Sequence, residues 1–193
     1  VPGLIAVLAL IGSVLSGALS IAREREEGTF DQLLVAPYTP REILLGKGIS
    51  TVITSIMQTF FIVLVAMFWF RIPFQGSIWL LSGAILLFII TGAAIGLCIS
   101  SFSQSLQQAI VGTFLLVVPT VMLSGFATPI SSMPEFFQDL TLLNPMRYGL
   151  ELIQRIFLEG AGFMDLWPLF GAITLVTIGT AAAAIFSFHR KIS

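Results

Sequence analysis

Residues 78–102 read IWLLSGAILLFIITGAAIGLCISSF, a stretch of 25 residues without a single Asp, Glu, Lys or Arg. A helix needs about 20 mainly apolar residues to cross the ~30 Å hydrocarbon core of a bilayer. A charged side chain at the centre of such a helix costs about 2.5–3.5 kcal/mol. A helix is also the expected conformation in lipid, because it satisfies its own backbone hydrogen bonds. The stretch therefore predicts a membrane-spanning helix.

Apolar stretches of similar length lie on both sides of this one, at residues 4–22, 49–70, 109–127 and 166–188. The composition agrees, because 56% of the residues are hydrophobic and only 10% are charged, whereas soluble domains carry roughly 25% charged residues. We therefore predict an all-α membrane protein. Residues 1–193 should form a single transmembrane domain, a polytopic helical bundle of about five transmembrane helices.

The basic residues in the connections predict the orientation, because cytoplasmic loops carry an excess of Lys and Arg. Six lie on one side of the predicted bundle, namely Arg23, Arg25, Arg41, Lys47, Arg190 and Lys191. Three lie on the other side, namely Arg71, Arg147 and Arg155. The loop 23–48 is thus expected in the cytoplasm and the segment 129–165 outside, in a multi-pass protein of the plasma membrane.

The loop 23–48 contains two capping-box patterns, in which a Ser or Thr is followed three residues later by Glu or Gln. Thr29 and Gln32 predict a helix of about two turns over residues 30–35, and Thr39 with Glu42 predicts the start of a long helix that continues through the second span. So short a helix is marginal alone. It could dock a cytoplasmic partner, or it could be an ordinary interfacial helix that joins two spans.

The segment 129–165 predicts two short amphipathic helices that form a hairpin at the outer leaflet. A capping box at Ser132–Glu135 should begin the first helix, and Asn144-Pro145 should end it and cap the second. The first helix has an apolar stripe at Met133, Phe136, Phe137, Leu140 and Leu143. The second has a stripe at Met146, Leu150, Ile153 and Phe157, and charges of alternating sign at Arg147, Glu151, Arg155 and Glu159.

Small residues at four-residue spacing predict close contacts between spans. They are Gly12, Ser13, Ser16, Gly17, Gly92 and Gly96. The contacts could lie within one subunit, or the first span could line an interface between two copies. Pro119 should kink or loosen the fourth span and could serve gating.

The predicted spans hold few polar residues that could mark a substrate path. Gln58 and Thr59 are the clearest candidates, and the absence of charges favours a neutral, apolar or amphipathic cargo over an ion. The chain has no P-loop, HExxH or GxSxG motif, so we predict no catalytic residues and no bound metal. A net charge of -1 argues against nucleic-acid binding.

Two longer motifs stand in the loop 23–48 and around the segment 129–165. The first is EREEGTFDQLL at residues 24–34, followed by Pro37 and PREILLGK at residues 40–47. The second is LSG at residues 123–125, followed by Pro129, MP at residues 133–134 and LNPMRY at residues 143–148. Both motifs resemble the type-2 permeases of ABC transporters, and the chain is similar to bacterial permeases of the drug-export kind. That resemblance implies a sixth span and an extracytoplasmic domain before residue 1.

The resemblance also implies two sets of functional residues. The first set would couple the permease to a cytoplasmic ATP-binding cassette ATPase and comprises Glu24, Arg25, Glu26, Glu27, Gly28, Thr29, Phe30, Asp31, Gln32, Leu33 and Leu34. The second would form the outer hairpin and gate and comprises Pro119, Gly125, Pro129, Asn144, Pro145, Arg147 and Tyr148.

The family implies that ATP and Mg are bound by the ATPase and that two permeases pair, either two copies or two related chains. Membrane lipids complete the expected partners. Two alternatives remain open from the residues, namely a channel or secondary transporter that works without ATP, and a membrane scaffold that recruits a cytoplasmic protein.

Overall fold

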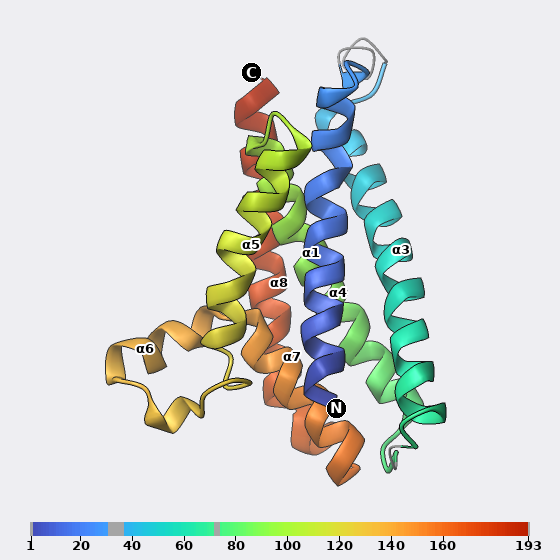
Figure 1. Ribbon diagram of the computed structural model, residues 1–193, viewed down its shortest axis with the longest axis vertical. Helices are drawn as coiled ribbons and strands as arrows, with labels where there is room; N and C mark the ends of the chain where they lie inside the picture. Colours follow the sequence, from blue (N-terminus) through green and yellow to red (C-terminus); the bar gives the residue numbers. More distant parts are fainter. Residues whose placement is uncertain (1, 31–36, 72–73, 193) are drawn as a thin grey trace.

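The computed structural model describes residues 2–30, 37–71 and 74–192, and these form helices joined by short turns, without a strand (Figure 1). Among the described residues, five long helices run along the bundle: α1 (Pro2–Glu26), α3 (Pro40–Phe68), α4 (Ile78–Phe102), α5 (Leu106–Met122) and α8 (Phe163–Ile192). Shorter elements lie between α5 and α8: η1 (Ile130–Ser132), α6 (Glu135–Leu140), η2 (Thr141–Leu143), α7 (Pro145–Gln154) and η3 (Arg155–Glu159). The predicted all-α class is confirmed.

Within the described residues, α1, α3, α4 and α8 are long and apolar enough to cross a membrane. The fourth predicted span, over residues 109–127, is shorter than expected, because α5 begins at Leu106 and ends at Met122 after 17 residues. At 1.5 Å per residue it covers only about 25 Å. Pro119 lies in its last turn, and Gly125 follows with a φ of 89°, a left-handed conformation that a helix cannot include.

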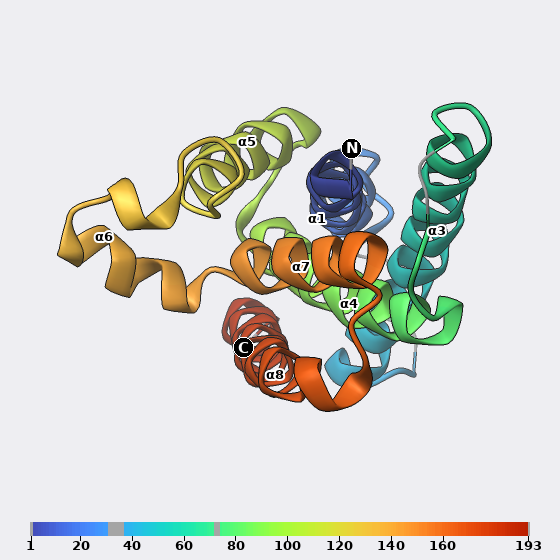
Figure 2. The same cartoon turned by 90° about the horizontal axis from the view of Figure 1, so that it is seen from below.

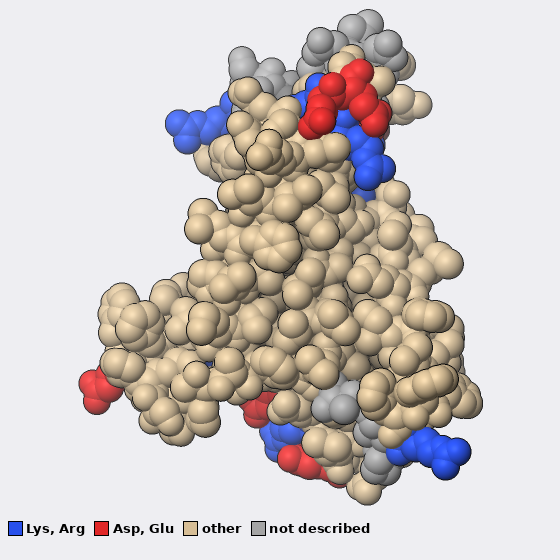
Figure 3. Space-filling view, in the orientation of Figure 1, with Lys and Arg blue, Asp and Glu red and all other residues tan. Residues whose placement is uncertain are grey.

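Charged side chains gather at the two ends of the molecule and leave an uncharged band between them on the face that Figure 3 shows. One end holds the C-terminal end of α1, the start of α3, the turn between α4 and α5, and the C-terminal end of α8 (Figure 1). We call this the loop end. The opposite, hairpin end holds α6 and α7 and corresponds to the side predicted to lie outside. This distribution fits a bundle that crosses hydrocarbon with its charges in water.

Helix α1 lies against α4 along the predicted small residues. A Cβ atom added to Gly96 would lie 2.2 Å from the carbonyl oxygen of Val14, and one added to Gly17 would lie 2.8 Å from that of Ala93. A Cβ atom added to Gly92 would clash with the side chain of Ser13, which is fully buried. The small-residue pattern therefore brings the two backbones together within one chain, as such patterns do between membrane helices.

Helix α7 crosses beneath α1 and α4 at the hairpin end (Figure 2). Its predicted apolar stripe is confirmed, because Met146, Leu150, Ile153 and Phe157 are all buried. The turn of η3 ends at Gly160, whose φ of 61° matches the predicted stop.

The first outer helix differs from its prediction. The capping box at Ser132 is wrong, because Ser132 belongs to the 3-10 turn η1 and the residue that precedes α6 is Pro134, which makes no side-chain cap. The stripe on α6 is not buried against this chain, since Phe136 and Leu143 are each 74% exposed. The hairpin instead extends sideways from the bundle (Figure 1).

Candidate functional site

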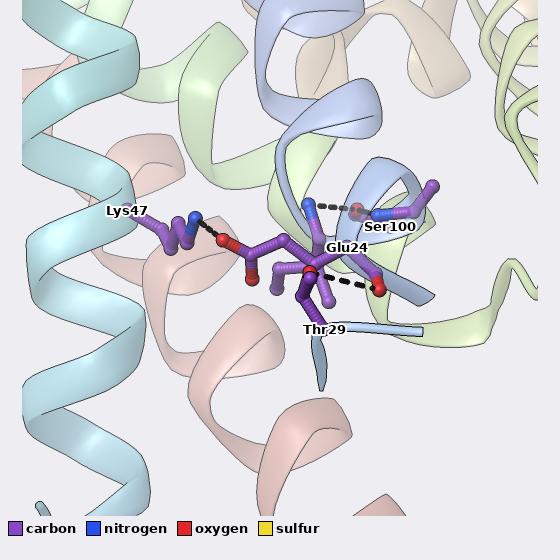
Figure 4. Close-up of polar contacts among 6 residues, drawn as sticks. Glu24, Thr29, Lys47 and Ser100 are labelled. Carbon is purple, nitrogen blue, oxygen red and sulfur yellow. Dashed lines mark hydrogen bonds and ion pairs between the residues drawn. The ribbon is translucent and has the colours of Figure 1, made fainter. Parts of the chain in front are cut away.

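The last residues of α1 are charged, and three in succession contact three different helices. Glu24 comes first. Its carboxylate forms an ion pair with the ammonium of Lys47 on α3, and both side chains are mostly buried (Figure 4). This pair joins the two helices that the loop 23–48 connects. Lys47 was part of the sequence motif, but its pairing with Glu24 was not predicted.

Arg25 holds the end of α4. Its Nη1 atom donates hydrogen bonds to the carbonyl oxygens of Ser101 at 3.0 Å and Ser103 at 2.9 Å. These carbonyls belong to the last turn and the C-cap of α4, where the helix has no backbone donors left for them and where its dipole favours a cation. The guanidinium also lies over the ring of Phe30, 4.7 Å from its centroid.

Glu26 holds the beginning of α5. Its Oε2 atom accepts a 2.6 Å hydrogen bond from the backbone N–H of Leu106, the first residue of that helix. A carboxylate is favourable there because the first backbone N–H groups of a helix lack partners and carry partial positive charge. Arg25 and Glu26 therefore fix the α4–α5 turn to the end of α1 from both sides.

A tight turn follows these anchors. The backbone N–H of Thr29 donates to the carbonyl oxygen of Glu24 at 2.9 Å, and the Thr29 hydroxyl donates to the same oxygen at 3.3 Å. Gly28 makes the turn possible with a φ of 72°. Glu27 and Gly28 are exposed at its tip. The predicted cap between Thr29 and Gln32, and the helix over residues 30–35 after Phe30, lie outside the described residues, as do Asp31, Leu33 and Leu34.

Phe30, one of the residues that the resemblance assigns to coupling, is half-buried. Its side chain packs against a cluster of this chain's own residues, Ile21, Leu44, Leu97, Ala184 and Phe188. The ring thus closes the loop onto α1, α3, α4 and α8. Among the described residues of the motif at residues 24–34, Glu26, Glu27, Gly28 and Thr29 are exposed.

Ser100 supplies a further contact that was not predicted from the sequence. Its Oγ atom, on α4, accepts hydrogen bonds of 3.0 Å from the backbone N–H groups of both Ile21 and Ala22 on α1 (Figure 4). Backbone donors of one helix seldom bond a side chain of another. The contact therefore fixes α1 to α4 just before the charged anchors.

The outer motif at residues 143–148 forms a second set of anchors, at the hairpin end. The Asn144 side chain bonds two helices, since Nδ2 donates to the carbonyl oxygen of Thr120 on α5 at 2.7 Å and Oδ1 accepts from the N–H of Met146 at 2.9 Å. The predicted cap on α7 is thus confirmed, with Pro145 in its first position. The bond to α5 was not predicted.

Two further residues of this motif bond the turn η2 that precedes α7. Arg147 donates from Nη1 to the Thr141 hydroxyl at 2.6 Å, and the Tyr148 hydroxyl donates to the carbonyl oxygen of Leu142 at 2.7 Å. Arg147 thus departs from the predicted line of charge pairs. The rest of that line is confirmed, because Arg155 pairs with Glu151 at 3.5 Å and with Glu159 at 3.3 Å.

The remaining predicted residues lie apart from these anchors. Gly125 and Pro129 form the link from α5 to η1. On α3, Gln58 is exposed and lies against Gly12 of α1, whereas Thr59 is buried and lines a hollow of about 460 Å³ between α3 and α4. The structure therefore separates the two polar residues proposed for a substrate path, since neighbours on a helix point about 100° apart.

The described part of the chain shows no group of three or more His, Cys, Asp or Glu residues that could hold a metal ion. The site thus consists of hydrogen-bonded and ionic anchors. Such anchors can hold helix ends in fixed relation, so that displacement of the loop would displace α1, α3, α4 and α5 together. This bundle, with its loop fixed to the ends of the spans, defines a polytopic membrane protein.

Comparison with known proteins identifies the family. The family model for the ABC-2 type transporter matches residues 1–158, and the chain belongs to this family. It is 35% identical over 192 residues to the probable multidrug ABC transporter permease YbhR of Escherichia coli (strain K12), covering 100% of this chain and 52% of that protein.

Two other relatives agree. The inner membrane transport permease YhhJ of Escherichia coli (strain K12) is 34% identical over 188 residues, covering 96% of this chain and 50% of that protein. The linearmycin resistance permease protein LnrN of Bacillus subtilis (strain 168) is 26% identical over 179 residues, covering 93% of this chain and 46% of that protein. The chain thus spans about half the length of these relatives. The chain is a membrane-spanning permease of the ABC transporter type and a multi-pass protein of the plasma membrane.

Proposed function

We propose that the chain is part of an ABC exporter permease that receives mechanical force from a separate cytoplasmic ATPase through the loop 23–48. The observation that carries the proposal is the set of anchors on consecutive residues. Glu24 bonds α3, Arg25 bonds the end of α4, and Glu26 bonds the start of α5. A loop that merely joined two spans would need no contact with α4 and α5.

In this proposal the exposed tip of the loop, Glu27 and Gly28, together with residues 31–34, contacts the ATPase. The ATPase holds ATP and Mg and performs the hydrolysis, and this chain binds neither. A second permease, identical or related, completes the transporter. The relatives named as multidrug permeases support this arrangement by their family.

The cargo proposed is apolar or amphipathic. The hollow beside Thr59 supports this choice, because most of the residues that line it are hydrophobic, among them Phe60, Met67 and Phe74. A charged cargo would need ionisable partners in such a place, and the hollow has none among its described lining residues.

The test is co-purification of the complete permease with a candidate ABC ATPase from the same organism, followed by measurement of ATP hydrolysis with candidate compounds. Glu27→Lys and Leu33→Asp should reduce ATPase binding while the permease still inserts into the membrane. Glu135→Lys is the matched control for Glu27→Lys, because Glu135 is an exposed glutamate at the hairpin end. It should leave ATPase binding unchanged.

The proposal fails if the wild-type permease binds no ATPase and transports without ATP, as a channel or secondary transporter would. It also fails if Glu27→Lys and Leu33→Asp bind the ATPase as well as the wild type does. ATPase binding without compound-stimulated hydrolysis or transport would indicate a scaffold instead.

A further inference from the structure

Helices α3 and α8 converge toward the loop end (Figures 1 and 2). A hollow of about 800 Å³ lies between them there, lined by Arg41 from the first turn of α3 and by Ala182, Ile185, Phe186, His189 and Arg190 from the end of α8. Arg41, His189 and Arg190 are exposed. Two arginines and a histidine therefore face one hollow from two helices that are distant in the sequence.

A second hollow, of about 340 Å³, shares Ile185 with the first and extends toward the hairpin end between α3, α4 and α8. Its α3 side is formed by Leu45, Ile49 and Ile53, which follow one another at four-residue spacing and are 60%, 60% and 54% exposed. Small residues such as Gly48 and Ala181 give it depth. The second hollow thus forms an apolar groove that meets the cationic first hollow at Ile185.

The geometry points to a binding site for an anionic phospholipid of the cytoplasmic leaflet. The phosphate of the headgroup lies between Arg41 and Arg190, and an acyl chain lies in the apolar groove along Leu45, Ile49 and Ile53. The arginine guanidinium suits this role, because its planar donors match the oxygens of a phosphate. Basic pockets between membrane helices on the cytoplasmic side are a recurrent form of lipid recognition.

Charge and position favour a lipid over other occupants. The described lining of both hollows contains no acidic residue. The nearest acid in the sequence, Glu42, accepts hydrogen bonds from the backbone N–H and the hydroxyl of Thr39 at 2.7 Å and 2.9 Å, so its carboxylate is held at its own helix cap. A soluble anion could use the arginines, but only a lipid also fills an apolar groove in the uncharged band.

The experiment measures lipid affinity of the complete permease in detergent, by native mass spectrometry with added phosphatidylglycerol or phosphatidylcholine of identical acyl chains. The wild type should prefer phosphatidylglycerol. In the double variant Arg41→Gln/Arg190→Gln, that preference should fall about five-fold for each arginine removed. The loss of positive charge weakens phosphatidylglycerol more than phosphatidylcholine, because the choline group balances the phosphate charge of the latter. Ala181→Phe, which fills the apolar groove, should weaken both lipids.

The matched control is Arg23→Gln, because Arg23 is an exposed arginine at the loop end that does not line either hollow. It should keep the full preference. Circular dichroism and gel filtration of each variant show whether it has folded, and addition of inorganic phosphate tests the role of the acyl chain. Excess phosphate should not displace phosphatidylglycerol.

Three results would overturn the inference. The first is an unchanged preference in a folded Arg41→Gln/Arg190→Gln variant. The second is an equal loss of the preference in Arg23→Gln, which would show that the preference arises from the general positive charge of the loop end. The third is complete displacement by phosphate, which would show an anion site without a lipid. If the double variant instead loses only ATPase binding, the arginines belong to a protein interface, and the proposed coupling by the loop is unaffected.

Discussion

The guanidinium of Arg25 donates a 2.9 Å hydrogen bond to the carbonyl oxygen of Ser103, a residue 78 positions further along the chain. The bond joins the end of α1, from which the loop 23–48 departs, to the C-cap of α4, close to the contact of Ser100 with the same helix α1. In the proposed coupling, this bond is a direct route by which a force on the loop would reach α4.

Arg25→Ala should uncouple the loop from α4. The variant loses two hydrogen bonds from a charged donor and its contact with Phe30, and each bond to a charged group contributes about 1.5–3 kcal/mol, with the lower end expected for a half-exposed side chain. Hydrogen exchange at residues 97–102 should become faster. The ATPase should still bind, but transport per ATP hydrolysed should fall several-fold.

Two variants control for charge. Arg25→Lys keeps a cation with several donors and should retain most of the coupling, whereas Arg23→Ala removes an exposed arginine from the same turn and should change neither exchange nor transport. Equal effects of Arg23→Ala and Arg25→Ala would show that the positive charge of the loop matters and the contact with α4 does not.

Gly96→Ala should separate α1 from α4. The new Cβ would lie 2.2 Å from a backbone carbonyl oxygen, that of Val14, which cannot rotate away as a side chain would. Extra volume in such a contact lowers the free energy of unfolding by about 1–3 kcal/mol, so the thermal unfolding midpoint in detergent should fall. Gly83→Ala in the same helix meets no atom within 4 Å and should leave the midpoint equal or slightly higher. An unaffected Gly96→Ala protein would refute the close contact.

Two substitutions at Asn144 should separate its two bonds. Asn144→Ala loses the cap on α7 and the bond to Thr120. Together these losses should lower the free energy of unfolding by about 1–3 kcal/mol. Asn144→Asp can still accept from Met146 but cannot donate to the carbonyl of Thr120. Hydrogen exchange should therefore accelerate in both α5 and α7 for the Ala variant, and only at the end of α5 for the Asp variant. Equal protection of α5 in wild type and Asn144→Asp would contradict the bridge.

Local features could be predicted because their causes lie within a few residues. The capping box at Thr39 and Glu42 is confirmed, with both of its hydrogen bonds present, and so is the cap by Asn144. The box at Ser132 failed although its pattern was equally good. A 3-10 turn that ends at Ser132 and the fixed φ of Pro134 set the start of α6 at Glu135 instead.

The sequence by itself determined that this chain forms helices across a membrane, because uncharged stretches of about 20 residues are stable in hydrocarbon only as helices. It also determined which segments form the polar ends of the bundle. Only the tertiary structure decided what the charges of the loop do. Glu24, Arg25 and Glu26 bond residues 23 to 80 positions away, and no local pattern encodes such distances. Partners of this kind depend on how α1, α3, α4 and α5 pack, and that packing is fixed by close backbone contacts such as Gly96 against Val14.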